Sequence, residues 1–219
     1  MKSLVITGTD TEVGKTVASA ILAAHFSRFY QVHYQKPVQT GLLEDNDALM
    51  VKNLTKNFSN ITASLGQGFL RGLSPHLAAL YENRHINILE VIKNTQLSCK
   101  SELNLIEGAG GLLVPLNSRH LMIDLFLALG HSCVLVARSK IGTINHTLLS
   151  IEALRTRKIK LAGIILMGEK KRDTEQSIKY YGRINNLLSI PFFPSLNSDF
   201  ITHIIDTHHQ KLTEFTKGF

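Results

Sequence analysis

Cysteine is scarce in this sequence, and several other features that define whole classes of protein are missing. The two cysteines, Cys99 and Cys133, have no partner at metal-ligand or redox-motif spacing, which argues against a disulfide framework or a cysteine-based metal site. No apolar run approaches the ~18 residues needed to cross a bilayer, and neither an internal repeat nor a low-complexity tract is visible. Hydrophobic residues make up 44% of the chain and charged residues 19%, which argues against disorder.

The surplus of positive charge is modest. Lys and Arg number 24 against 17 Asp and Glu, giving a net charge of +7. The densest basic run, at 170–172, is short and has no interleaved aromatic residues, so we expect a solvated loop there and no nucleic-acid partner. Met1 leads almost directly into an apolar segment without a small-residue cleavage site, which predicts a cytoplasmic protein with no membrane contact.

Short apolar runs rich in Val, Ile and Leu alternate with longer helix-like segments. Continuous hydrophobicity in such short runs indicates strands buried on both faces, as in a parallel sheet covered by helices. We therefore predict an α/β protein, a three-layer sandwich with a mainly parallel sheet flanked by helices, formed by residues 1–219 as a single domain. The expected strands are 4–7, 32–35, 103–106, 133–137 and 161–167, the expected helices are 17–30, 74–83 and 174–188, and 56–72 is expected to be a long connection.

The strongest motif lies between the first expected strand and an Ala-rich helix, and it reads Gly8-Thr9-Asp10-Thr11-Glu12-Val13-Gly14-Lys15-Thr16. Glycines let backbone N–H groups turn toward a phosphate, and the helix N-terminus adds positive potential. Lys15 is placed to reach the β- and γ-phosphates, and the Thr16 hydroxyl is suited to Mg²⁺. Five residues, one more than usual, separate Gly8 from Gly14, and the polar side chains of Thr11 and Glu12 could face a second substrate.

Charged residues also follow two other expected strands. Lys36 should lie on the same rim as the phosphate loop, where a second fixed cation suits phosphoryl transfer to an anion, although alone it reads equally as a surface lysine. Asp47 and Glu107 are the candidate carboxylates for Mg²⁺. Asp47 could instead simply cap a helix. The segment 140–146 could bind a substrate carboxylate at a helix N-terminus, and an ordinary helix start is an equally good interpretation.

Six segments in this order resemble the dethiobiotin synthetase family, and the resemblance runs to about residue 194. Besides the phosphate loop, which has the family's extra residue, they are Lys36-Pro37-Val38-Gln39-Thr40-Gly41, Asn46-Asp47-Ala48, Ser74-Pro75-His76, Glu107-Gly108-Ala109-Gly110-Gly111 and Lys140-Ile141-Gly142-Thr143-Ile144-Asn145-His146. The resemblance implies a phosphate-loop NTPase fold and an ATP-dependent ligase reaction. In it, CO₂ from bicarbonate is captured by 7,8-diaminononanoate as a carbamate, the γ-phosphate is transferred to the carbamate, and a cyclic urea closes.

The resemblance also implies roles for particular residues. Lys15 and Lys36 would neutralise the carbamate and the migrating phosphoryl group, with Thr11 beside them, and no general base is obvious. Thr16, Asp47 and Glu107 would hold Mg²⁺. The implied nucleotide contacts are Glu12, Val13, Gly14, Lys15, Thr16, Val17, Asp47, Glu107, Gly108, Ala109, Gly110, Met167, Gly168, Pro191, Phe192 and Phe193. The implied substrate contacts are Thr11, Glu12, Lys36, Thr40 and Gly110, together with Gly142, Thr143, Ile144 and Asn145 of the second subunit of a homodimer.

The chain departs from the family at Met167-Gly168, where relatives commonly have an Asn that reads adenine. A thioether lacks the donor and acceptor of an amide. We therefore hypothesise weak discrimination between bases, with recognition left to backbone groups near Met167, Gly168 and 191–193.

A rival interpretation is a phosphate-loop ATPase switch of the partitioning or metallocluster-assembly kind. Such proteins share the fold. The Lys36-Pro37 and Thr40-Gly41 pairs and the 140–146 segment have no evident purpose in a switch, so the sequence favours the ligase.

Overall fold

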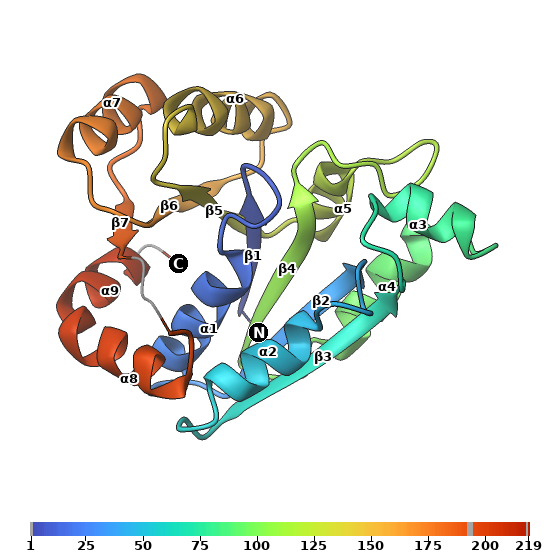
Figure 1. Cartoon of the computed structure of the whole chain (residues 1–219), viewed down its shortest axis with the longest axis horizontal. Coiled ribbons are helices and arrows are strands. Elements are labelled where there is room, and N and C mark those ends of the chain that lie inside the picture. The colour runs from blue at the N-terminus through green and yellow to red at the C-terminus, as the bar shows by residue number, and fades with distance from the viewer. Residues whose placement is uncertain (1, 192–194, 218) are drawn as a thin grey trace.

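The computed structural model describes residues 2–191, 195–217 and 219, and a parallel β-sheet runs through its centre. Its seven strands have the order β3-β2-β4-β1-β5-β6-β7 (Figure 1). All neighbouring strands pair in parallel. The strands are β1 (Lys2–Gly8), β2 (Val32–Gln39), β3 (Ile61–Gly68), β4 (Leu103–Gly111), β5 (Ser132–Arg138), β6 (Leu161–Met167) and β7 (Leu187–Ile190).

Helices cover both faces of this sheet. Helices α1 (Lys15–Phe26), α2 (Asp47–Leu54), α8 (Ser198–Thr207) and α9 (His209–Thr216) share one hydrophobic core with it. The other face carries α3 (Pro75–Tyr81), α4 (Ile88–Ser98), α5 (Met122–Leu129), α6 (Thr143–Thr156) and α7 (Arg172–Gly182). Among the described residues, no helix combines the length and the apolar character needed to cross a membrane.

The apolar strands behave as the sequence predicts. In β1, Leu4 and Ile6 belong to the core under α1, whereas Val5 belongs to the core on the opposite face. Because successive side chains of a strand point to opposite faces, an unbroken apolar run is what a strand buried on both sides requires. The predicted fold class is confirmed, and β6 has the predicted bounds.

Several predicted element boundaries are wrong. The strand expected at 32–35 continues to Gln39, so Lys36 lies inside β2 and does not follow it. The expected connection at 56–72 contains β3, an edge strand with no fully buried residue. Its Thr, Ser, Gly and Gln residues need no continuous apolar pattern because only one strand pairs with it. The strand predicted to stop before Glu107 continues to Gly111, so Glu107 lies inside β4 and is fully buried.

The C-terminal third also differs from the prediction. The helix expected at 174–188 ends at Gly182, where Arg183 adopts a left-handed conformation with φ of 46°, and β7 follows as the second edge strand. Helices α8 and α9 lie in a part of the chain for which no element was predicted. Ile201, Ile204 and Ile205 of α8 pack into the α1 core at helical spacing.

Candidate active site

The phosphate loop connects β1 to α1 through a backbone that favours glycine at two positions. A Cβ atom on Gly8 would lie 2.8 Å from Val13 Cγ2 and 2.9 Å from the Asp10 carbonyl oxygen. Gly14 is the N-cap of α1 with φ of 94°, a conformation that favours glycine, and it supplies no capping side chain. The first N–H groups of α1 therefore remain suited to an anion. Lys15 is buried and donates to the Asp10 carbonyl oxygen at 2.9 Å.

Three oxygen-bearing side chains converge beside the loop. The Thr16 hydroxyl lies 3.0 Å from Asp47 Oδ1 and 3.1 Å from Glu107 Oε1. These side chains come from α1, from the first residue of α2 and from the interior of β4. A hydroxyl and two carboxylates are oxygen ligands of the kind that Mg²⁺ takes, so the donor set fits this metal.

Lys36 lies in the same cluster rather than on the surface. Its Nζ is 2.6 Å from Asp47 Oδ2 and 2.8 Å from Glu107 Oε1, and it also donates to the Gly108 carbonyl oxygen at 3.2 Å. Its side chain is 4% exposed. The interpretation of Lys36 as a surface lysine is therefore wrong.

Polar residues that sequence reasoning did not single out hold these carboxylates in place. Ser19 Oγ and the Tyr34 hydroxyl donate to Glu107 Oε2 at 2.7 and 3.0 Å. Gln39 Oε1 accepts from the Asp47 backbone N–H at 3.1 Å. Tyr34 and Lys36 are two residues apart in β2 and so point to the same face. The two-residue spacing is the sequence signal that could have identified Tyr34. It points to a contact with Glu107 only once β4 is known to lie beside β2.

Asp47 does not cap α2, because the residue before it does so. Asn46 is the N-cap of α2, and its side chain accepts from the Leu49 backbone N–H. Asp47 is the first residue of the helix, and both of its carboxylate oxygens contact the cluster. Its side chain therefore faces the site instead of capping the helix.

The pKa of Lys15 is lowered and that of Lys36 is raised, because burial has the larger effect at Lys15 and the neighbouring carboxylates have the larger effect at Lys36. Burial lowers the pKa of Lys15 to about 8, and the Lys36 ammonium adds to this effect. Burial alone would lower the pKa of Lys36 as well, but the Glu107 and Asp47 carboxylates outweigh it and raise that pKa above its ordinary value. Burial, followed by the Glu107 charge, raises the pKa of Tyr34 well above its ordinary value. The two carboxylates therefore favour the charged form of Lys36.

A cavity of about 330 Å³ opens over the cluster and contains most of the predicted site. The predicted residues that line it are Thr11, Glu12, Gly14, Lys15, Thr16, Val17, Lys36, Thr40, Asp47, Glu107, Ala109 and Gly110. Gln39, Asp45 and Met50 line it too, and none of these had been predicted. The structure thus brings both lysines and the metal-ligand candidates together.

Other predicted nucleotide contacts lie around this cavity. Val13 is buried beneath the loop, and Met167 packs against Gly14. Two backbone groups proposed to read the base are already used within the sheet, since the Met167 carbonyl accepts from Ser139 and the Gly168 N–H donates to Ile190. Phe192 and Phe193 lie outside the described residues.

The predicted carboxylate-binding segment does not line this cavity. Gly142 is the N-cap of α6, and Thr143 lines a separate hollow of about 180 Å³ together with Thr9 and Asp10. Asn145 is exposed. Within one chain, the segment 142–145 therefore takes no part in the phosphate-loop cavity.

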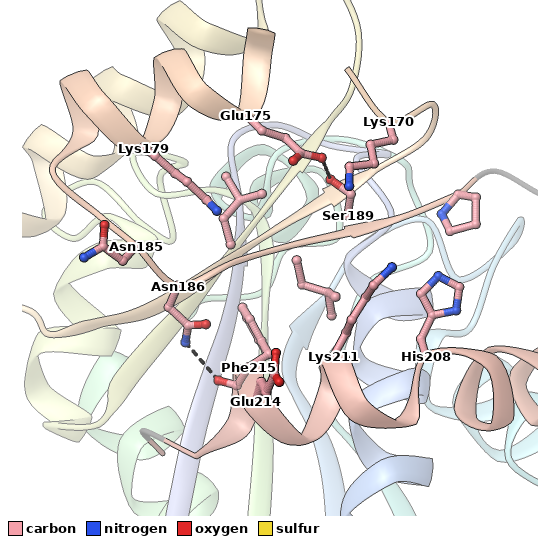
Figure 2. Close-up of a pocket in the computed structure, with 13 residues that line it drawn as sticks. Lys170, Glu175, Lys179, Asn185, Asn186, Ser189, His208, Lys211, Glu214 and Phe215 are labelled. Atoms are coloured by element: carbon pink, nitrogen blue, oxygen red, sulfur yellow. Dashed lines mark hydrogen bonds between the residues drawn. The ribbon is translucent and has the colours of Figure 1, made fainter. Parts of the chain in front are cut away.

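A larger cavity of about 510 Å³ lies beside the edge strand β7, between α7 and α9 (Figure 2). Lys170, Lys179 and Lys211 line it, and the Ser189 hydroxyl donates to Glu175 across it. Pro191 also lines this cavity and not the one over the phosphate loop. No residue of the phosphate loop lines it, so we assign the chemistry to the smaller cavity.

Comparison with known proteins identifies the family of this chain. A family model described as an AAA domain matches residues 2–199. The ATP-dependent dethiobiotin synthetase BioD of Brucella ovis is 40% identical over 201 residues, which cover 91% of each chain. The BioD protein of Lawsonia intracellularis is 38% identical over 94% of this chain and 96% of its own. The bifunctional protein BioCD of Bordetella avium is 41% identical over 87% of this chain and 39% of its own.

Solved structures share the fold at low identity. The septum site-determining protein MinD of Pyrococcus horikoshii, complexed with Mg-ADP, has a TM-score of 0.64 at 17% identity and covers 99% of this chain and 96% of its own. A plasmid partition protein of Borrelia burgdorferi bound to AMPPNP has a TM-score of 0.61 at 13% identity and covers 98% and 97%. These likenesses show a phosphate-loop NTPase fold and nothing finer. The identity with BioD proteins across nearly the whole chain goes further, and the chain belongs to the ATP-dependent dethiobiotin synthetase family.

Proposed function

We propose that this protein is an ATP-dependent cyclo-ligase that makes dethiobiotin, and that the phosphate-loop cavity is its active site. An amine of 7,8-diaminononanoate adds to CO₂ and loses a proton to give a carbamate. A carbamate oxygen attacks the γ-phosphorus and ADP leaves. The second amine then attacks the carbamate carbon, phosphate leaves, and a cyclic urea forms. The observation that carries the proposal is the convergence of Lys36, Lys15 and a carboxylate pair in one cavity.

The nucleotide phosphates bind at the N-terminus of α1. The uncapped N–H groups of the first turn and the Lys15 ammonium face the cavity and supply the positive potential that a triphosphate needs. Glu12, Val17, Ala109 and Gly110 border the same space. Lys15 and Lys36 together stabilise the charge that develops during phosphoryl transfer.

Magnesium is the proposed cofactor, held by Thr16, Asp47 and Glu107. The support is the chemistry of the donor set, a hydroxyl within 3.1 Å of both carboxylates. When bound, Mg²⁺ offsets the negative charge of the β- and γ-phosphates. Ser19 and Tyr34 orient Glu107 for this role, and Gln39 orients the start of α2.

The diamine and its carbamate lie on the other side of the terminal phosphate. Thr11, Glu12, Thr40, Gly110 and Lys36 all line the cavity, which supports their role as substrate contacts. We propose a homodimer in which the segment 142–145 of the second copy binds the substrate carboxylate, because this segment begins a helix yet does not reach the cavity of its own chain.

We also propose that the chain functions as a single domain in the cytoplasm, where ATP and bicarbonate are available, and that nucleic acid and membranes are not among its partners. One sheet joins all the described strands, which supports a single domain. The longest cluster of basic residues, at 170–172, contains no aromatic residue on which a base could stack.

A direct test is to supply diamine, bicarbonate, Mg²⁺ and ATP and to look by mass spectrometry for the cyclic urea. We expect product with the wild type, and a loss of at least ~100-fold for Lys36→Ala because it removes a charge that stabilises the transition state. Lys52→Ala removes an exposed lysine on α2 and should leave product formation unchanged. ADP formation that does not depend on diamine and bicarbonate would favour an ATPase switch.

A further inference from the structure

Lys36 has no hydrogen-bond donor to spare in this structure. An ammonium group has three N–H donors. Those of Lys36 have three acceptors within reach, Asp47 Oδ2 at 2.6 Å, Glu107 Oε1 at 2.8 Å and the Gly108 carbonyl oxygen at 3.2 Å. The group is also almost wholly shielded from solvent. In this arrangement Lys36 cannot bind a substrate anion without giving up one of these contacts.

The two carboxylates depend on a cation at this position. Glu107 is fully buried, and Asp47 retains only part of its exposure. An unpaired charge in such surroundings is strongly destabilising. The other buried lysine of the site, Lys15, donates to the Asp10 carbonyl oxygen instead. Lys36 therefore supplies the positive charge that directly contacts both carboxylates and offsets their mutual repulsion.

We propose that Lys36 is the resident counter-ion of the Asp47–Glu107 pair in the ligand-free protein and that metal loading replaces it. When the metal takes the carboxylates, the N–H donors of Lys36 become free to bind the anions of the reaction. Metal binding and anion binding by Lys36 are therefore coupled. Lys36 and a divalent ion would compete for the same two carboxylates, because two cations that share these ligands repel each other. This inference rests on the proposed magnesium site.

The coupling predicts that removing the Lys36 charge makes the metal bind more tightly. Mn²⁺ would be titrated into nucleotide-free protein and followed by electron paramagnetic resonance. If Lys36 occupies the pair at least nine-tenths of the time, Lys36→Met should bind Mn²⁺ at least ~10-fold more tightly than the wild type. Lys15→Met is the matched control. It removes another buried charge of the same cavity but no contact with the pair, and we expect a change below about threefold.

The stability of the metal-free protein gives a second, independent readout. Lys36→Met leaves two carboxylates without their counter-ion, so its melting temperature should fall by about 5–10 °C without metal and recover with Mn²⁺. Combining Lys36→Met with Asp47→Asn removes one of the unpaired charges, and we expect the double variant to melt above Lys36→Met. The double variant keeps the test informative even if Lys36→Met does not fold alone.

The outcomes separate this inference from the proposed function. Equal tightening of Mn²⁺ binding by Lys36→Met and Lys15→Met would overturn the exchange, since general charge repulsion would then explain both. The inference would also be overturned if the loss of stability in the double variant equalled the sum of the losses in Lys36→Met and Asp47→Asn alone. Failure of wild-type protein to bind Mn²⁺ even with saturating ADP would instead remove the magnesium site on which the proposed function depends.

Discussion

Met167, which stands where the relatives in the resemblance commonly have an Asn, lies against the phosphate loop. A Cβ atom on Gly14 would be 3.0 Å from Met167 Cγ, so the thioether side chain covers the turn that begins α1. Its carbonyl and the Gly168 N–H already bond to Ser139 and Ile190. Residue 167 thus offers apolar surface, and the Gly168 N–H, which already has an acceptor, is not free to read the edge of a base.

We therefore predict weak nucleotide selectivity, with turnover on ATP, GTP and CTP within about tenfold of one another, because apolar contact discriminates poorly between polar edges. Met167→Asn should sharpen the preference for ATP. Met167→Leu is the matched control, since it keeps the apolar contact and adds no amide. Steady-state kinetics with the three nucleotides measures the effect, and a strong ATP preference in the wild type would contradict the hypothesis.

At the scale of single residues, the sequence predicts the charged residues of the site better than the polar residues that hold them in place. Lys15, Lys36 and Asp47 stand at or near strand ends and helix starts, where ligands of parallel sheets gather. Ser19, Tyr34 and Gln39 lie inside elements, where polar side chains have many uses. Their role follows from the adjacency of α1, β2 and β4, which no local pattern in the sequence contains.

Among the helices, the contact of α9 with α1 includes a buried histidine. His25 of α1 is 1% exposed, and its Nε2 lies 3.2 Å from the Thr216 hydroxyl of α9. Its Nδ1 has no hydrogen-bond partner among the described residues. Burial, with help from His209 and Arg28, lowers the pKa of His25 to about 4. The helix pair is therefore built around a neutral imidazole.

This arrangement predicts a loss of stability in acid. Between pH 6.5 and 4 the unfolded chain binds a proton at His25 that the folded chain does not, so the free energy of unfolding falls as the pH falls. We expect His25 to account for roughly 1–2 kcal/mol of that fall after allowance for solvent screening. Urea denaturation at pH 7.5 and 4.5 measures it. His25→Leu should flatten the pH dependence, whereas His85→Leu, at an exposed position, should leave it unchanged.

Four of the elements that sequence reasoning missed share a physical cause. Edge strands β3 and β7 are paired on one side only, so they lack the continuous apolar run that reveals β1 or β6. Helices α8 and α9 were missed because only some of their side chains, such as Ile204 and Leu212, are buried, and many of the residues between them are polar. Interior strands could be predicted because burial on both faces constrains every residue.

For the whole molecule, the open question is whether one chain contains a complete active site. The phosphate-loop cavity has both lysines and the carboxylate pair, but the segment 142–145 lines no part of it. The exposed Ile141 and Asn145 near the start of α6 are available to a second copy. A site shared across a two-fold interface would complete both cavities at once, because such an interface presents the same surface of each subunit to the other.

Subunit mixing decides between shared and separate sites. Lys36→Met and Asn145→Ala should each be inactive, since one damages the phosphate-loop side of the site and the other the proposed carboxylate contact. In a mixed dimer with shared sites, one site contains both changes and the other contains neither. Equal mixing after reversible dissociation should then restore about a quarter of wild-type activity, because half of the dimers are mixed and each has one intact site. With separate sites every site keeps one change, so demonstrably mixed dimers without activity would show that each chain works alone.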